Sequence, residues 1–326
     1  MWGDFTSAGV LKKYGALMDT SNGASCINNA EPNGRVFACA PDGNGGYYIG
    51  GEFTEMSNVN RRHLAHITST GEVSEWNPNA NGTVFALAVS GSTVYIAGSF
   101  TSIGGVTRNR IAAVDATTGQ AFAWNPNASA DVLSLAVSGN IIYAGGGFQI
   151  IGGNSREKIA ALDATTGLAT AWNPNANSYV NSLFVSGTRV FAGGSFTTIG
   201  GQTRNYLAEL NATTGQATSW NPNPNGGVYA LTMSGGTLYA GGWFTKIGAL
   251  TRNNIAAIDA TTGQATAWNP NANNPVRSLA ISDNKVYAGG DFSMIGGQNH
   301  NFIAVLDAVT SLAKPWNPKA NNTVQA

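Results

Sequence analysis

The sequence predicts an all-β protein, a seven-bladed β-propeller with four antiparallel strands per blade and a seventh blade split between the N- and C-termini. Three observations predict this fold. A long stretch of sequence returns at a fixed period, one aromatic position recurs seven times, and the two ends of the chain carry complementary parts of one further unit. We therefore expect residues 1–326 to form a single domain.

The repeated stretch reads IAAVDATTGQAFAWNPN at residues 111–127 and returns with small changes at 159–175, 207–223, 255–271 and 303–319. Its tryptophans, Trp124, Trp172, Trp220, Trp268 and Trp316, stand 48 residues apart, and Trp76 extends the series backwards by the same step. A period of this length, with several short β-like runs in each unit, is typical of a repeat architecture.

Each unit contains four short segments that favour β-structure. In the second full unit they are residues 83–90 and 93–100, joined by a Gly-Ser turn, then 110–115, and finally 120–124 after the turn ATTG. A longer link, TSIGGVTRN, connects the second segment to the third. Pro126 has no N–H to donate to a ladder, so we expect the fourth strand to end before it.

The two ends of the chain complete the count of seven units. The recurring phenylalanines are Phe5, Phe53, Phe100, Phe148, Phe196, Phe244 and Phe292. Residues 1–33 match the later strands of a unit, 34–321 form blades one to six, and 322–326 begin a first strand, so the ends can share one blade. An open solenoid is the alternative, but it would gain nothing from complementary ends. The repeat spacing leaves about nine residues of that blade unaccounted for, which predicts either a longer native chain or a strand from a partner.

Composition limits the classes of partner. Charged residues make up 10% of the chain and formally cancel, so we expect neither nucleic acid nor an anionic membrane as a partner. No apolar run approaches the length of a membrane span, and the first residues lack the features of a signal peptide. Abundant Asn, Thr, Ser and Gly favour an extracellular or cell-surface location. Cys26 and Cys39 are either a disulfide or, as we favour, two buried thiols.

The pattern A-x-D-x-x-T-G followed by Trp, seen at Ala113–Gly119 and Trp124, resembles the tryptophan-docking repeat of quinoprotein-like propellers. Together with the recurring GG-x-FT-x-IGG and WNPN segments, it also resembles secreted bacterial β-propeller repeat proteins. The resemblance covers almost the whole chain. It differs in one detail, because the Trp follows the Gly by five residues instead of four. The family implies a propeller that serves either as a dehydrogenase or as a non-catalytic scaffold.

Residues that recur in nearly every unit are expected to build the blades. We expect the tryptophans to be buried between blades, and Asp115, Asp163, Asp259 and Asp307 to accept backbone N–H bonds in the turns that follow them. Asn211 replaces the acid in one unit, which fits a turn role. A basic position also recurs, as Lys13, Arg61, Arg108, Arg156, Arg204, Arg252 and His300. It either ties down the link between the second and third strands or forms a ring for anionic ligands.

Positions at which the units differ are the candidates for ligand binding. Before the repeated Phe, the ring order places Asp291, Asp4 and Glu52 on neighbouring blades, with Trp243 one blade further round. Three carboxylates beside an aromatic side chain would suit a sugar or a hard cation such as calcium. A second set stands at the start of the first strands and includes Arg35, Asp131, Tyr179, Asn181, Tyr229, Arg277 and Gln325. Solvated strand ends are the structural alternative for both sets.

Catalytic signatures are absent from the sequence. His63 and His66 are three apart on an expected strand and point to opposite faces, no adjacent cysteine pair is present, and no Gly-rich phosphate loop carries a Lys. We therefore predict a non-enzymatic binding or display module with no cofactor, which recognises a protein or a glycan through the face with the longer loops. Two alternatives stay open. One is a structural subunit, joined to other domains or completed by a neighbour's strand, and the other, ranked last, is a quinoprotein-like oxidoreductase.

Overall fold

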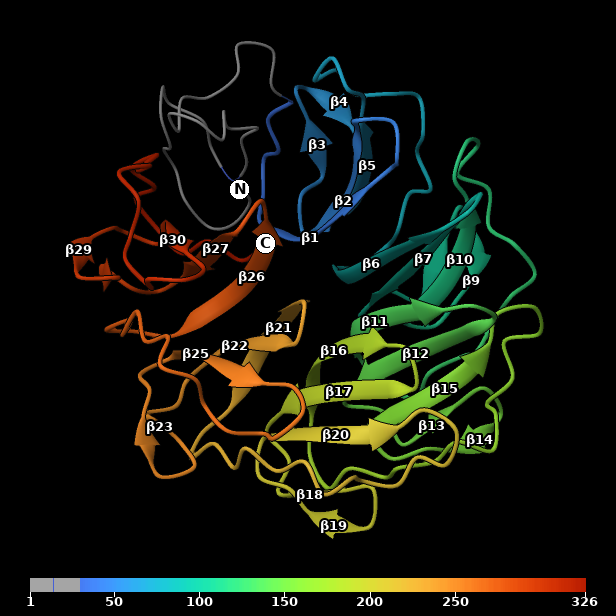
Figure 1. The fold of residues 1–326 in the computed structure, drawn as a ribbon. Coiled ribbons are helices and arrows are strands. Elements are labelled where there is room, and N and C mark those ends of the chain that lie inside the picture. Colours follow the sequence, from blue (N-terminus) through green and yellow to red (C-terminus); the bar gives the residue numbers. More distant parts are fainter. Residues whose placement is uncertain (1–13, 15–29) are drawn as a thin grey trace.

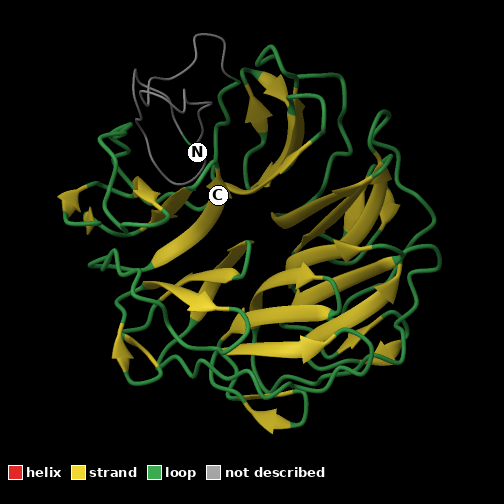
Figure 2. Ribbon diagram, in the orientation of Figure 1, coloured by secondary structure: helices red, strands yellow, loops and turns green. Residues whose placement is uncertain are grey.

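The computed structural model of the protein describes Tyr14 and residues 30–326. Every regular element in these residues is a β-strand, and no helix occurs among them (Figure 2). The strands form six antiparallel three-stranded sheets and six two-stranded ribbons within this part of the chain. The sheets follow one another around a common centre, in the order of the sequence (Figure 1).

Each three-stranded sheet begins with an inner strand, and the inner strands of consecutive sheets contact one another. The inner strands are β1 (Val36–Pro41), β6 (Val84–Ser90), β11 (Val132–Ser138), β16 (Val180–Ser186), β21 (Val228–Ser234) and β26 (Val276–Ser282). The middle strands are β2 (Tyr47–Gly51), β7 (Thr93–Gly98), β12 (Ile141–Gly146), β17 (Arg189–Gly194), β22 (Thr237–Gly242) and β27 (Lys285–Gly290). The third strands are β5 (Leu64–Ile67), β10 (Ile111–Asp115), β15 (Ile159–Asp163), β20 (Leu207–Asn211), β25 (Ile255–Asp259) and β30 (Ile303–Asp307).

The longer link between the second and third strands folds into a short ribbon in each described blade. The ribbon pairs are β3 (Glu55–Met56) with β4 (Val59–Asn60), β8 (Ser102–Ile103) with β9 (Val106–Thr107), β13 (Ile150–Ile151) with β14 (Asn154–Ser155), β18 (Thr198–Ile199) with β19 (Gln202–Thr203), β23 (Lys246–Ile247) with β24 (Leu250–Thr251), and β28 (Met294–Ile295) with β29 (Gln298–Asn299). One apolar side chain of each ribbon is buried, such as Ile103 or Ile199, which fastens the ribbon to its blade.

The predicted fourth strand is wrong in every described blade. The segment expected at residues 120–124 forms one isolated bridge, from Ala121 to Val114, and leaves the sheet. A guanidinium replaces the ladder there, because Arg108 donates to the carbonyl of Phe122. The chain then turns so that Trp124 is buried between blades and Pro126, which cannot donate, follows.

The blades pack through one repeated contact. The first residue of each described inner strand is a buried valine, and from β6 onward this valine lies against a small residue of the preceding middle strand. A Cβ added to Gly241 would lie 2.7 Å from Cγ1 of Val276, so the glycine leaves the space that the next blade fills. Val324 makes the same contact with Gly289, with an added Cβ 2.8 Å from its Cγ1, and Ala326 packs against the first blade. The C-terminal residues therefore connect the sixth sheet to the first (Figure 1).

The remaining strands predicted for a seventh blade fall in residues 1–29, which lie outside the described residues apart from Tyr14, so the split seventh blade stays a prediction. Cys26 also lies outside them, and Cys39 is half-buried on β1. The described part of the chain contains no helix with the length and apolar character needed to cross a bilayer.

Candidate functional site

Two predicted sets of site residues meet at one end of the blades. In each blade the residue after the middle strand donates its backbone N–H to the carbonyl of the residue before the inner strand. Glu52 N lies 2.8 Å from Arg35 O, Trp243 N 2.8 Å from Gly227 O, and Asp291 N 2.9 Å from Pro275 O. We call these paired positions the rim: Arg35 with Glu52, Thr83 with Ser99, Asp131 with Gly147, Tyr179 with Ser195, Gly227 with Trp243, and Pro275 with Asp291.

The carboxylates of the rim do not stand free for a cation. Glu52 receives both Nε and Nη2 of Arg35, the latter at 3.0 Å. Asp291 receives Nε of Arg277 at 2.9 Å and the hydroxyl of Thr323 at 2.8 Å. Asp131 is the most exposed, at 3.7 Å from Nε of Arg110.

Asp4, the third carboxylate of the predicted cluster, lies outside the described residues. Within residues 30–326 no group of three His, Cys, Asp or Glu side chains is placed to hold a metal ion. Arginine has therefore offset the charge of both described members of the cluster.

Asp291 has a defined charge state. Burial by itself would raise its pKa, but hydrogen bonds from Arg277 and Thr323 outweigh burial and hold the pKa below its usual value. The carboxylate is ionised throughout the neutral range, and its charge is matched by the guanidinium of Arg277. The pair presents a fixed, neutral set of polar atoms at the rim.

A β-bulge interrupts every described inner strand at the same place, one residue after the buried valine. The bulged residues are Phe37, Phe85, Leu133, Asn181, Tyr229 and Arg277. Neighbouring members touch, since the rings of Phe37 and Phe85 are 5.7 Å apart and Cζ of Arg277 lies 5.9 Å from the ring centre of Tyr229. Bulges re-aim side chains, and two of the bulged residues, Phe37 and Tyr229, line the cavity enclosed by the inner strands. Of the bulged residues, sequence analysis picked out Asn181, Tyr229 and Arg277; the signal for the others was the high variability of this one position.

Two aromatic side chains of the rim are exposed. Trp243 is 67% exposed and Tyr179 52%, whereas the repeated tryptophans from Trp76 to Trp316 are all buried. The ring of Tyr179 covers Gly147, because a Cβ added there would lie 2.6 Å from the ring. Both side chains combine a large apolar ring with a polar group, so they offer stacking area and a hydrogen-bonding atom at the rim.

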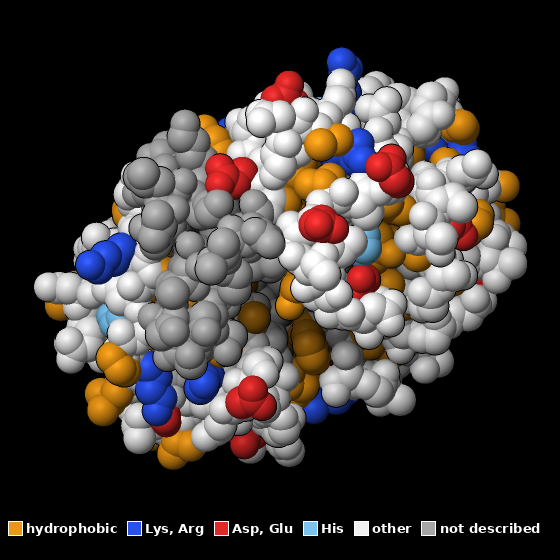
Figure 3. Space-filling model, turned by 90° about the horizontal axis from the view of Figure 1, so that it is seen from above, with side chains coloured by type: hydrophobic (Ala, Val, Ile, Leu, Met, Phe, Trp, Pro, Cys, Tyr) orange, Lys and Arg blue, Asp and Glu red, His pale blue; other side chains and the backbone are white. Residues whose placement is uncertain are grey.

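A cavity of about 630 Å³ lies below the rim. It is lined by residues of β1, β6, β16, β21 and β26, with Tyr229 and Gln325 among them. Most of the lining is apolar, with small polar side chains such as Ser182 and Ser278. Figure 3 shows one face of the molecule, on which charged side chains are few and scattered among uncharged ones. None of the described residues that line the cavity carries a charged side chain.

The recurring residues take the structural roles predicted for them. From Trp76 to Trp268 the indole N–H donates to a backbone carbonyl of the following unit: Trp76 to Asp115 at 3.0 Å, Trp124 to Asp163 at 3.0 Å, Trp172 to Asn211 at 2.9 Å, Trp220 to Asp259 at 3.1 Å and Trp268 to Asp307 at 2.9 Å. An aromatic ring of the same blade packs against each indole, as Tyr143 does against Trp172 at 5.1 Å. The tryptophans thus join consecutive blades.

The acidic and basic repeats hold loops. Oδ1 of Asp163 accepts the N–H groups of Thr165 and Thr166, at 3.0 and 2.7 Å, and these hydrogen bonds lower its pKa. Asn211 accepts the same two bonds in its own blade, at 2.9 Å each, which confirms the turn role. The repeated arginines donate to carbonyls, as Arg108 does to Thr107 at 2.8 Å, so they tie down the blade instead of forming an anion site.

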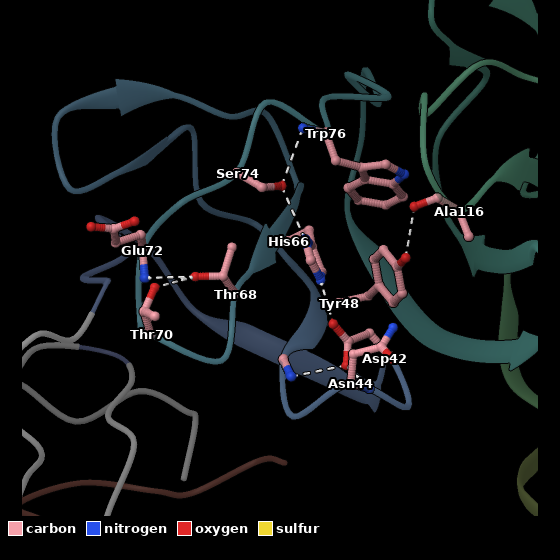
Figure 4. Close-up of polar contacts among 11 residues, drawn as sticks. Asp42, Asn44, Tyr48, His66, Thr68, Thr70, Glu72, Ser74, Trp76 and Ala116 are labelled. Atoms are coloured by element: carbon pink, nitrogen blue, oxygen red, sulfur yellow. Dashed lines mark hydrogen bonds and ion pairs between the residues drawn. The ribbon is translucent and has the colours of Figure 1, made fainter.

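Blade one contains a Ser, a His and an Asp in line (Figure 4). The ring of His66 lies between Asp42, at 3.0 Å from Nε2, and Ser74, at 3.0 Å from Nδ1. Asp42 belongs to a hairpin turn that is longer than the turns of the other blades.

The serine hydroxyl is already in use, because Oγ of Ser74 accepts the N–H of Trp76 at 3.2 Å. Thr170 makes the equivalent bond in another blade, at 3.2 Å and without a histidine. The backbone N–H of Ser74 donates to His66 O at 2.9 Å, so it is not available as an oxyanion donor. Through these contacts the three residues hold the long turn between β1 and β2 against the segment before Trp76.

The repeated sheets around a channel define the class of the protein, a β-propeller. The family described as outer membrane protein assembly factor BamB matches residues 49–269, and a β-propeller domain of unknown function matches residues 281–308. The first match covers more than half of the chain, which therefore belongs to that family.

Solved structures support the fold. The chain is similar to the computationally designed Ika8 protein, with 16% identity over 90% of this chain and 89% of that one and a TM-score of 0.55. It is also similar to the WD40 β-propeller domain of Doa1, with 12% identity over 84% and 79% of the two chains and a TM-score of 0.58. At these identities the likeness shows the fold alone. No curated protein matches the chain.

Proposed function

We propose that the chain is a non-catalytic binding module of an extracellular or cell-surface protein and recognises a protein or a glycan through the rim. One observation carries this proposal: the blades agree wherever a residue builds the propeller and differ at the rim. The buried valines, the docked tryptophans and the loop-holding arginines repeat, whereas the rim position before the inner strand carries Arg35, Thr83, Asp131, Tyr179, Gly227 and Pro275 in turn.

The rim can vary because the backbone contact that builds it is the same in every described blade. Its backbone is held by one hydrogen bond per blade that does not depend on the side chain. A rigid ring that carries variable side chains above a cavity is the usual arrangement of a binding face.

The test compares the wild-type chain with a rim variant, Y179A/W243A/R277A, on arrays of immobilised glycans and of cell-surface proteins. A matched control variant, L168A, changes a side chain that is 60% exposed and follows the turn headed by Asp163. The proposal expects at least one ligand that wild type and L168A retain and the rim variant loses. Equal retention by all three proteins would place binding elsewhere and refute it.

A second candidate is a structural subunit of an assembly. The family description, an assembly factor, supports it, and so does Val324, which takes the place of the first residue of a further inner strand. Light scattering over a concentration series tests this candidate. Growth of the particle with concentration, abolished by Val324→Asp, would support assembly through this edge, whereas a constant monomer mass would reject it.

A further inference from the structure

We propose that the rim of blades five and six binds a neutral saccharide, with one sugar ring stacked on Trp243 and its hydroxyl groups directed to Arg277 and Asp291. This inference rests on the proposed function and names the ligand class of that site. Five features of the described residues on blades five and six carry it: an exposed indole, a glycine floor, a second aromatic ring, a guanidinium and a carboxylate.

The indole is the first feature. Trp243 is 67% exposed at a position where other blades carry Glu52, Ser99, Gly147, Ser195 and Asp291. Its exposure gains nothing for the fold, because blade five already has its docked tryptophan, Trp268, buried with its N–H on Asp307 O. An exposed indole offers a flat apolar face of the kind on which the C–H face of a pyranose packs.

Two glycines, Gly226 and Gly227, form what we call the glycine floor near Trp243. Gly227 stands where Arg35, Asp131 and Tyr179 stand in other blades, and its carbonyl accepts the N–H of Trp243. A Cβ added to Gly226 would lie 2.1 Å from the carbonyl oxygen of Trp243, and one added to Gly227 would lie 3.2 Å from the ring of Tyr229. Gly226 thus admits the backbone of Trp243, and Gly227 admits the ring of Tyr229, where a side chain at either position would crowd them.

The polar groups follow on the channel side of this floor. The ring of Tyr229 lies next to Gly227 and lines the cavity, and Cζ of Arg277 is 5.9 Å from the centre of that ring. Asp291 fixes the guanidinium through Nε at 2.9 Å and Nη2 at 2.7 Å, and Thr323 holds the carboxylate. Donors and acceptors in fixed positions beside an aromatic face suit vicinal hydroxyl groups.

Charge favours a neutral sugar over an acidic one. The positive charge of Arg277 is already matched by Asp291, so an added carboxylate or sulfate on the ligand would compete with Asp291 instead of meeting an unpaired cation. The chain as a whole has no net charge to attract an anion.

The experiment titrates short neutral oligosaccharides, built of hexose or of N-acetylhexosamine units, into the wild-type chain and follows heat and tryptophan fluorescence. W243A is expected to weaken binding at least about tenfold, because aromatic stacking contributes about 1.4 kcal/mol. R277A is expected to weaken it by a similar factor, and G227V, which fills the floor, to abolish it. L168A is expected to bind as wild type does.

Three results would overturn the inference: no binding by any neutral oligosaccharide at millimolar concentration, unchanged affinity of W243A, or tighter binding of oligosaccharides of uronic acids. Circular dichroism of each variant checks that the sheets are intact, and a properly folded W243A keeps the result interpretable if G227V does not fold. If the neutral sugars fail but the Y179A/W243A/R277A variant loses a protein ligand on the array, the sugar assignment falls and the proposed function stands.

Discussion

Blade four contains a partly buried Arg–Glu ion pair that the other described blades lack, and removing it should measure its contribution to stability. Arg189 on β17 donates to Glu209 on β20, with Nε at 2.7 Å from Oε2, and its guanidinium also donates to the carbonyl of Ala260 in the next blade. The side chain of Glu209 is 9% exposed and that of Arg189 31%. The equivalent residues in the next blade are Thr237 and Ala257, so the repeat itself shows how to replace the pair.

The magnitudes follow from what each change leaves behind. R189T leaves Glu209 buried without its cation, and we expect a loss of about 3 kcal/mol in the free energy of unfolding. E209A leaves Arg189 partly exposed, still bonded to Ala260 and 4.7 Å from the ring of Phe191, so the loss should be about 1 kcal/mol. The double variant removes both charges and forfeits mainly the bond to Ala260, again about 1 kcal/mol. The coupling energy of the cycle is then about 3 kcal/mol.

Adding F191Y should restore part of that loss, because Tyr48 donates its hydroxyl to Ala116 O at 2.7 Å in the equivalent geometry of blade one. The assay is urea unfolding of the four proteins of the cycle, followed by tryptophan fluorescence and analysed by linear extrapolation. An R189T variant as stable as wild type, or a double variant no more stable than R189T, would refute the reasoning, since either result means that the burial of an unpaired Glu209 carries no penalty.

Three further predictions concern the repeat contacts and the rim. His300 is buried where other blades carry Arg, and burial lowers its pKa. Because the imidazole binds a proton more readily in the unfolded chain, the free energy of unfolding should fall as the pH drops below about 6.5, the pKa of an unfolded histidine. H300R should weaken this pH dependence in urea titrations at pH 5 and 7 and raise the free energy of unfolding by about 1 kcal/mol at neutral pH. Trp172→Phe removes the N–H that Asn211 O accepts and should cost about 1–3 kcal/mol by thermal and urea unfolding, whereas Trp243→Phe should leave stability unchanged; equal effects would contradict a role between blades. The pKa of the Asp291 carboxyl group should lie below 3.8 by NMR and move upward in R277A, so Asp291 stays ionised down to pH 5. An unshifted titration would show that the pair does not form in solution.

The sequence alone determined the first three strands of the blade but not its fourth segment or its ribbon. The 48-residue period located the hairpins to within two residues, since strands expected at 83–90 and 110–115 are observed at Val84–Ser90 and Ile111–Asp115. It also separated structural residues from variable ones, because a residue present in every unit must serve a contact present in every unit. Three repeated residues confirm this reasoning. Trp172 donates to the backbone carbonyl of Asn211, Asp163 accepts the backbone N–H of Thr166, and Arg204 donates to Thr203 O at 2.8 Å.

The tertiary structure decided what the variable residues do together. Glu52 and Asp291 were predicted as members of one acidic cluster, yet each is paired with an arginine of its own blade. Arg35 precedes the buried valine of its inner strand and Arg277 follows it, and both positions lie opposite the end of the middle strand. The bulge that turns Tyr229 toward the channel arises from pairing between strands and leaves no mark in the local pattern. Sequence periodicity reports which face of a strand is buried within one unit, whereas the contacts of a rim depend on how separate units are placed beside one another, and only the packed blades fix that placement.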